Sequence, residues 1–234
     1  MPVLTRAQHV DVLVQYLYMA RSGESRAGEL TRKKVIDAAA GLVAEVGYAG
    51  LTMRALAQRC GVPTMTLYRH VRDKEDLLGA LADRVLGELE LPEPGELSWQ
   101  EELAAVFRAV HDLLLKHPDV AEIAARQPVA GEAAYRGAEI VLEALRRAGI
   151  EGEAAASAFA TLFAFTLGFV QQQLLSAAPG NLSRRQAVLE RLPVDDFDNL
   201  SRLSAVFLLR SSDRHFEDGL QLIIRGLGEA GQAG

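Results

Sequence analysis

The stretch LTMRALAQRCGVPTMTLYRHVRDKEDLL, from Leu51 to Leu78, decides the fold of this chain. Its apolar residues recur at intervals of three and four, which indicates helices rather than strands. The spacing predicts two short helices, over 52–60 and 64–71, with Gly61-Val62-Pro63 between them, and a longer helix that starts at Asp73. Two short helices joined by a turn that contains glycine are typical of a helix-turn-helix motif.

Helical periodicity continues on both sides of the motif. The clearest boundary is the run Leu91-Pro92-Glu93-Pro94-Gly95, because two prolines and a glycine interrupt any helix. After it, Ser98 and Glu101 are spaced as a capping box that starts the next helix. The expected helices cover 31–47, 52–60, 64–71, 73–89, 98–117, 119–126, 132–148, 153–177 and 213–227.

Three segments are less clearly patterned. Residues 10–18 fit a helix and a strand about equally well, and a helix is favoured. Ser183 and Gln186 are spaced as a second capping box, whereas residues 192–210 predict no firm element. The sequence as a whole predicts an all-α fold, in which a small N-terminal bundle of short helices precedes a larger bundle of long helices.

Charge is unevenly distributed along the chain. The 234 residues include 25 basic and 31 acidic side chains, a net charge of −6 that by itself argues against a nucleic-acid partner. Residues 26–72 nevertheless hold eight basic and three acidic side chains, a balance of +5, while residues 1–25 are neutral and the remainder carries −11. The positive excess coincides with the predicted motif, where it favours binding to phosphates. A solvated basic face without a ligand is the alternative.

Two further features bear on the cellular compartment. Cys60 is the single cysteine, so a disulfide framework is not expected and a reducing compartment, the cytoplasm, is predicted. Residues 154–170 carry no charge, but the run is slightly shorter than the roughly 20 residues that span a bilayer. It also contains Ser157, Thr161 and Thr166. A buried helix at a core or subunit interface is therefore favoured over a membrane span.

The helix-turn-helix region resembles a known family. Residues 31–78 are similar to the DNA-binding domain of the tetracycline-repressor (TetR) family of transcriptional regulators, and many positions within 51–78 coincide with the family pattern. The family often has a hydroxyl residue where this chain has Pro63, so the capping of the second motif helix is expected to differ. The resemblance implies a three-helix DNA-binding domain (31–78) and an effector-binding and dimerisation domain (79–234). Residues 1–30 lie outside the resemblance and are expected to form an N-terminal extension that is helical.

Residues 64–70 would form the recognition helix, whose N-terminal end enters the major groove. Arg69 can bond two acceptors of guanine, while Thr64 and Met65 can touch thymine methyl groups. Phosphate contacts are expected from the hydroxyl, imidazole and ammonium groups around them. The expected DNA-binding residues are Thr52, Met53, Arg54, Thr64, Met65, Thr66, Tyr68, Arg69, His70 and Lys74.

Several of these residues have other interpretations. Thr52 is expected to cap the first motif helix. Tyr68 can instead be an aromatic residue at the edge of the core, and Met65 can fill a gap in packing. His70 can interact only with the C-terminal dipole of its helix.

The C-terminal part resembles the effector domain of the tetracycline-repressor subclass at Trp99, at Lys116-His117-Pro118 and over 215–227. The resemblance implies a homodimer formed through a four-helix bundle, and a small-molecule effector bound within the domain. The expected dimer seam comprises Phe159, Phe163, Leu167, Leu220, Ile224 and Leu227. The candidate pocket residues, each of which can equally be ordinary core or surface, are Phe107, His111, Leu114, Phe165, Phe169, Gln172 and Gln173.

These observations predict a cytoplasmic, dimeric, ligand-responsive repressor that binds a palindromic operator in double-stranded DNA. No cofactor is expected, and the six-residue spacing of His111 and His117 does not place them on one helical face as a metal pair. An all-α enzyme with its active site in the larger domain is the alternative. The sequence has no Gly-rich phosphate loop and no nucleophile with an obvious base to support that alternative.

Overall fold

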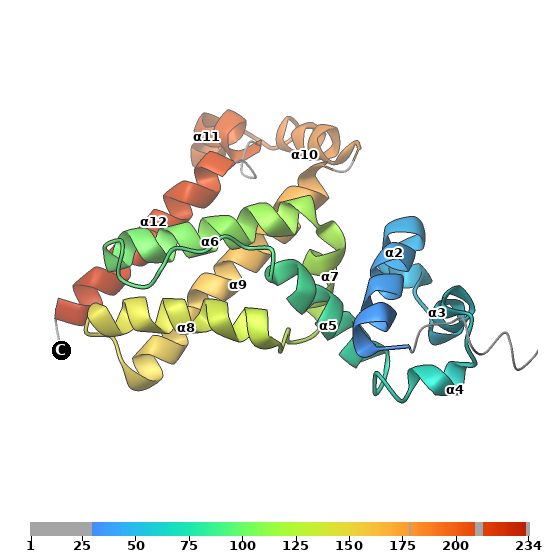
Figure 1. Ribbon diagram of the computed structural model, residues 1–234. Helices are drawn as coiled ribbons and strands as arrows, with labels where there is room; N and C mark the ends of the chain where they lie inside the picture. Colours follow the sequence, from blue (N-terminus) through green and yellow to red (C-terminus); the bar gives the residue numbers. More distant parts are fainter. Residues whose placement is uncertain (1–29, 178, 209–212, 233–234) are drawn as a thin grey trace, which may run out of the picture.

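The computed structural model describes residues 30–177, 179–208 and 213–232, and every regular element among them is a helix (Figure 1). The predicted all-α class is therefore confirmed for the described part of the chain. The expected helix over 10–18 lies outside the described residues. The helices are α2 (Arg32–Gly50), α3 (Met53–Cys60), α4 (Thr64–Leu67), α5 (Lys74–Leu86), α6 (Trp99–Lys116), α7 (Pro118–Arg126), α8 (Glu132–Arg147), α9 (Gly152–Ala177), α10 (Asn181–Leu189), α11 (Asp198–Leu208) and α12 (Asp213–Gln232).

Short polar side chains start the helices of the N-terminal bundle. The Thr52 hydroxyl accepts a hydrogen bond from the Ala55 N–H at 3.1 Å, which confirms the predicted cap of α3. The Asp73 carboxylate accepts from the Asp76 N–H at 2.7 Å and starts α5. Gly61 adopts a φ of +66° at the end of α3, a conformation that glycine reaches without a Cβ clash, and so makes the tight turn of the motif.

The second helix of the motif is shorter than the sequence predicts. Regular α4 ends at Leu67, and tighter turns follow, in which the His70 N–H bonds the Leu67 carbonyl at 2.8 Å. Pro63 occupies the N-cap position without a side-chain hydrogen bond, because its ring offers neither donor nor acceptor. The prediction of a regular helix over 64–71 is therefore wrong, although the recognition segment occupies the expected place between α3 and α5.

The larger bundle is organised around α6. Its start is the predicted capping box, in which the Ser98 hydroxyl accepts from the Glu101 N–H and the Glu101 carboxylate accepts from the Ser98 N–H. Helices α7, α8, α9 and α12 all pack against α6, and α9 also packs against α8 and α12 (Figure 1). A second buried cluster, centred on Leu103, Phe107, Leu145 and Leu162, fills this bundle.

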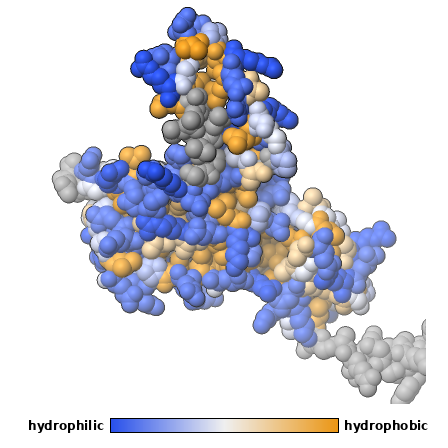
Figure 2. Space-filling model, turned by 90° about the horizontal axis from the view of Figure 1, so that it is seen from above, coloured by the Kyte–Doolittle hydropathy of each residue, from blue (hydrophilic) through white to orange (hydrophobic). Residues whose placement is uncertain are grey.

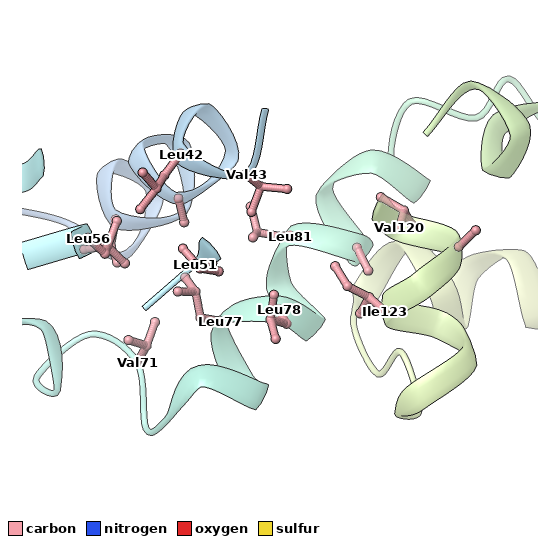
Figure 3. Close-up of a cluster of buried hydrophobic side chains, with 14 of the residues drawn as sticks. Leu42, Val43, Leu51, Leu56, Val71, Leu77, Leu78, Leu81, Val120 and Ile123 are labelled. Carbon is pink, nitrogen blue, oxygen red and sulfur yellow. The ribbon is translucent and has the colours of Figure 1, made fainter. Parts of the chain in front are cut away.

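One hydrophobic cluster joins the N-terminal bundle to the larger one. Figure 3 shows Leu77, Leu78 and Leu81 of α5 between the side chains of α2 and the Val120 and Ile123 side chains of α7. Leu114 of α6 and Val170 of α9 belong to the same buried cluster. The predicted domain boundary after residue 78 thus falls inside α5, within a continuous core.

The segment between α9 and α12 differs from the expectation. Helix α10 begins at Asn181 after Gly180, with no side-chain cap, so Ser183 and Gln186 do not form the second capping box. Gln186 instead donates to the Glu190 carboxylate at 2.8 Å. Helix α11 occupies part of the region where no firm element is predicted, and an Arg202–Asp198 ion pair one turn apart supports it.

Candidate nucleic-acid interface and effector cavity

The recognition segment buries some of its side chains in the core and exposes others to solvent. Leu67 and Val71 are buried and attach the segment to the core, whereas Met65 is 77% exposed. Tyr68 and Arg69 are also exposed, and Thr64, Thr66 and His70 are half-buried. The exposure of Met65 contradicts its interpretation as a filler of the core. The segment therefore exposes the side chains of Met65, Tyr68 and Arg69.

Arg32 holds the end of the recognition segment in place. Its guanidinium donates to the His70 carbonyl at 2.7 Å and to both oxygens of Asp76 at 2.9 and 3.1 Å. The Asp76 carboxylate also accepts from the Arg72 N–H at 2.9 Å. These contacts, the Arg32–Asp76 clamp, connect α2, the turn after α4 and the first turn of α5.

The clamp changes the acidity of Asp76. Hydrogen bonding to the Arg32 guanidinium lowers the pKa of Asp76 from 3.8 to about 2, against the opposing effect of its partial burial. The Arg72 N–H adds to the stabilisation of the charged carboxylate. Asp76 is therefore ionised in the folded protein at any physiological pH.

Other basic side chains of the N-terminal bundle also contact carboxylate or aromatic side chains of the protein. Arg59 forms two hydrogen bonds with Glu45, at 2.7 and 2.9 Å, and Arg84 pairs with Asp37. The Lys74 ammonium, a predicted phosphate contact, lies 5.1 Å from the centre of the Tyr48 ring. The positive excess of this region thus includes side chains that stabilise the fold.

Four exposed cations remain directed at solvent. Within the described part of the chain, the side chains of Lys33, Arg54, Arg69 and Arg72 form no ion pair. Arg54 lies in the first turn of α3 and Arg69 in the recognition segment. Met53 is half-buried beside Arg54, and Thr52 is exposed at the same end of α3. These positions favour contact with a polyanion.

A cavity of about 260 Å³ lies within the larger bundle. Its walls come from the end of α5 and the loop after it, from α6, α7 and α8, and from Phe159 and Phe163 of α9. Every lining side chain is apolar except that of Tyr135, which carries a hydroxyl group and is 65% exposed. A largely apolar, concave site of this kind is typical of small-molecule binding.

The predicted pocket residues divide into three groups. Phe107 and Leu114 line the cavity. Phe165, Phe169, His111 and Gln173 instead belong to a packed cluster around Phe216 of α12, while Gln172 is exposed. The sequence therefore identifies α6 as a wall of the cavity. It misses α8, which contributes Tyr135 and Val141, and the end of α5, which contributes Leu86.

His111 lies at the centre of that packed cluster. Its ring stacks on Phe216 at 3.9 Å between centroids, its Nδ1 lies 2.9 Å from Asp112 and its Nε2 lies 2.6 Å from the Gln173 oxygen. Gln173 in turn donates to Asp213 at 3.0 Å. The interactions join α6, α9 and α12. No group of three His, Cys, Asp or Glu side chains among the described residues is placed to hold a metal ion.

The predicted dimer residues lie on the inner faces of α9 and α12. Leu220 and Ile224 are 0% and 1% exposed within the single chain, Leu227 packs against the second cluster, and Leu167 packs against the first. Phe159 and Phe163 line the cavity. The outer face of α9 instead carries small exposed residues, and Leu222 of α12 is 64% exposed. A seam built from Leu220 and Ile224 is therefore wrong, because these side chains are already buried.

Helix α9 is long and apolar enough to cross a membrane by length and composition. It contacts α6, α7, α8, α10 and α12 within the bundle. The core helix of a folded bundle can have the same length and apolar composition. These contacts support the interpretation of residues 154–170 as a helix packed within the bundle.

An exposed recognition segment held between two helices, with unpaired arginines beside it, defines a helix-turn-helix DNA-binding protein. Comparison with known proteins gives the family. Residues 35–81 match the model for bacterial regulatory proteins of the tetR family, and residues 91–230 match the tetracyclin repressor-like C-terminal domain. The chain belongs to the tetR family of transcriptional regulators.

Individual relatives agree with this assignment. The class A tetracycline repressor protein of transposon 1721 from Escherichia coli is 34% identical over 203 residues, covering 85% of this chain and 91% of that protein. ActR of Streptomyces coelicolor, solved in complex with actinorhodin, superposes with a TM-score of 0.79 at 31% identity over 87% of this chain and 99% of ActR. BioQ with its double-stranded DNA operator gives a TM-score of 0.61 at 27% identity over 86% of this chain and 99% of BioQ.

The Arg32–Asp76 clamp predicts a pH-dependent contribution to stability. Because the folded-state pKa of Asp76 lies below its unfolded value, the contribution is complete above about pH 4 and is lost as the pH falls toward 2. Asp76→Asn should lower the free energy of unfolding by about 1 kcal/mol at neutral pH, since Arg32 is half exposed. Urea unfolding between pH 7 and pH 2 measures the difference.

Glu75→Gln, at an exposed neighbouring position on α5, is the matched control. Its difference in the free energy of unfolding from the unsubstituted protein should not change in this way with pH. A difference between Asp76→Asn and the unsubstituted protein that stays constant down to pH 2 would contradict the role of the clamp.

Proposed function

We propose that this protein is a cytoplasmic, ligand-responsive repressor that binds a palindromic operator as a homodimer and releases it when a small molecule occupies the 260 Å³ cavity. The observation that supports it most directly is the connection between the recognition segment and the cavity through the single helix α5. No specific observation favours the enzyme alternative.

Residues 64–70 of each subunit would enter successive major grooves. Arg69, Met65 and Thr64 are proposed to read base edges, since they lie on one exposed or half-exposed surface. Thr66, Tyr68, His70, Arg54 and Lys74 are proposed to contact phosphates. Thr52 and Met53 would position the start of α3 near the backbone, because the Thr52 oxygen already accepts the Ala55 N–H and keeps a hydroxyl proton to donate.

Dimerisation is proposed through the outer faces of α9 and α12. Exposed residues of α9 recur at three- and four-residue intervals, so they share one face of the helix. All of them are small over the middle of α9, which lets a partner helix approach closely, and Leu222 of α12 adds an exposed apolar side chain on the neighbouring helix. The proposed face comprises Ser157, Ala160, Thr161, Ala164, Gly168 and Leu222.

The transmission of effector binding is proposed to pass through Asp83. Its carboxylate on α5 accepts a hydrogen bond from the Ala134 N–H in the first turn of α8 at 2.9 Å, and Ala134 lines the cavity. About two helical turns earlier, the Glu75 carbonyl of α5 accepts from the Gln127 side chain at 2.9 Å. A ligand that displaces the first turn of α8 would thereby move α5 and the recognition segment attached to it.

Substitution of the base-reading arginine tests the DNA contact. Arg69→Ala should weaken binding to an operator selected from genomic fragments, and should relax the base preference at one position by roughly 1–3 kcal/mol. Arg59→Ala is the control, since Glu45 already holds that guanidinium. An electrophoretic mobility shift that Arg69→Ala leaves unchanged would remove Arg69 from the interface.

A charge on the proposed dimer face tests the assembly. Ala164→Glu would bury a carboxylate without a partner at the centre of the seam, so the dimer should weaken by about 3 kcal/mol or more. Sedimentation equilibrium measures the change. Ala125→Glu, on the exposed side of α7, should leave association unchanged. Equal association of the two variants would exclude this face.

The Asp83 contact predicts reciprocal coupling between DNA and the cavity wall. Operator binding should slow amide hydrogen exchange in the first turn of α8 by about 5-fold or more in the unsubstituted protein. The reason is that the DNA-binding surface and the cavity wall both favour particular positions of the same helix, α5. Asp83→Ala should abolish this slowing, whereas Asp195→Ala, in the exposed loop before α11, should preserve it. Exchange that slows equally in both variants would show that the coupling bypasses Asp83.

A further inference from the structure

We propose that the cavity between α5, α6, α7, α8 and α9 takes an uncharged, flat aromatic ligand with a single polar substituent. This inference rests on the proposed function, in which the same cavity is the effector site. It concerns the chemical class of the ligand, which is set by the residues of this chain.

The absence of charge follows from the lining. No lining residue carries a charged, amide, imidazole or aliphatic hydroxyl side chain, and the walls consist of aliphatic and aromatic groups together with Tyr135. A charged ligand would leave water without gaining an opposite charge, which is strongly unfavourable. The cavity therefore discriminates against anions and cations.

The one carboxylate that touches the cavity wall faces away from the ligand space. Asp83 lines a separate groove between α2, α5 and the loop that precedes α8. From there its carboxylate accepts from the Ala134 N–H, so its negative charge lies at the positive N-terminal end of α8. Asp83 is not itself among the lining residues of the cavity. It does not supply a counter-charge for a cationic ligand.

The shape of the ligand follows from the aromatic side chains. Phe159 and Phe163, one turn apart on α9, present nearly parallel rings, with 9° between planes and 6.3 Å between centroids. Phe107 of α6 lines the same space. Parallel ring faces favour a planar aromatic partner, and a volume of about 260 Å³ limits that partner to a compact ring system.

Tyr135 is the residue that would bind the polar substituent of the ligand. It is 65% exposed and lines the cavity, so it marks the side that opens to solvent. Its hydroxyl can donate to or accept from one ligand hydroxyl or carbonyl group. The remaining surface of the ligand would contact only apolar groups.

Two fluorescent probes with the same ring skeleton test the proposal on the full chain. N-phenylnaphthylamine is uncharged, and anilinonaphthalenesulfonate adds only a sulfonate. Titration should show the uncharged probe binding roughly tenfold or more tightly than the anion. The uncharged probe should also release the selected operator. Equal or tighter binding of the sulfonate would overturn the proposed ligand class.

Matched substitutions on α9 locate the bound probe. Phe159→Leu should weaken binding of N-phenylnaphthylamine by about fivefold or more, because it removes one of the two parallel rings. Phe165→Leu, in the Phe216 cluster on the same helix, should leave the affinity unchanged. Tyr135→Lys, at an exposed position, should raise the affinity for the sulfonate. Binding that responds equally to Phe159→Leu and Phe165→Leu would place the probe outside the cavity.

The two proposals fail in distinguishable ways. If the unsubstituted protein does not bind the operator in the absence of probe, the proposed function is contradicted. Normal operator binding together with a preference for the anionic probe would contradict only the ligand class.

Discussion

The packing of helix α5 is the constraint on which the rest of the structure depends. Its leucines, Leu77, Leu78 and Leu81, lie in one buried cluster with side chains of α2 and α7. Its first turn anchors the Arg32–Asp76 clamp at the end of the recognition segment, and its last turn reaches the cavity wall through Asp83. Burial of this kind stabilises only one relative placement of the two bundles, so a displacement of α5 displaces the recognition segment.

This arrangement also explains how an acidic protein can bind DNA. The positive excess over 26–72 divides between arginines that build the fold and arginines that face solvent. Arg32 and Arg59 from this region, together with Arg84 of α5, hold α2, α3 and α5 together through carboxylates. Arg54, Arg69 and Arg72 surround the recognition segment without an ion pair among the described residues. The acidic remainder of the chain would repel DNA, so binding is restricted to this surface. Figure 2 shows hydrophobic residues exposed at several places on the molecule, between larger areas of hydrophilic residues.

The sequence predicts local features well and contacts between distant helices poorly. Thr52, Asp73 and Ser98 act within one helical turn, so their capping roles can be predicted from spacing alone. The seam residues Leu220 and Ile224 were misplaced, because periodicity identifies an apolar face without showing whether it meets its own subunit or a partner. The small exposed residues on the opposite face of α9 are the basis of the dimer face that we propose instead. Tyr135 and Leu86 escaped prediction since no local pattern shows that α8 and the end of α5 enclose one space with α6.

We propose that occupation of the cavity moves α5 and thereby changes the distance between the two recognition segments of a dimer. Electron paramagnetic resonance on spin-labelled Gln58→Cys, in a Cys60→Ser background, measures the distance between the α3 helices of the two subunits. We expect one narrow distance distribution with operator DNA and a displaced distribution when N-phenylnaphthylamine fills the cavity. An unchanged distribution, in a protein that still releases its operator when the probe binds, would contradict it.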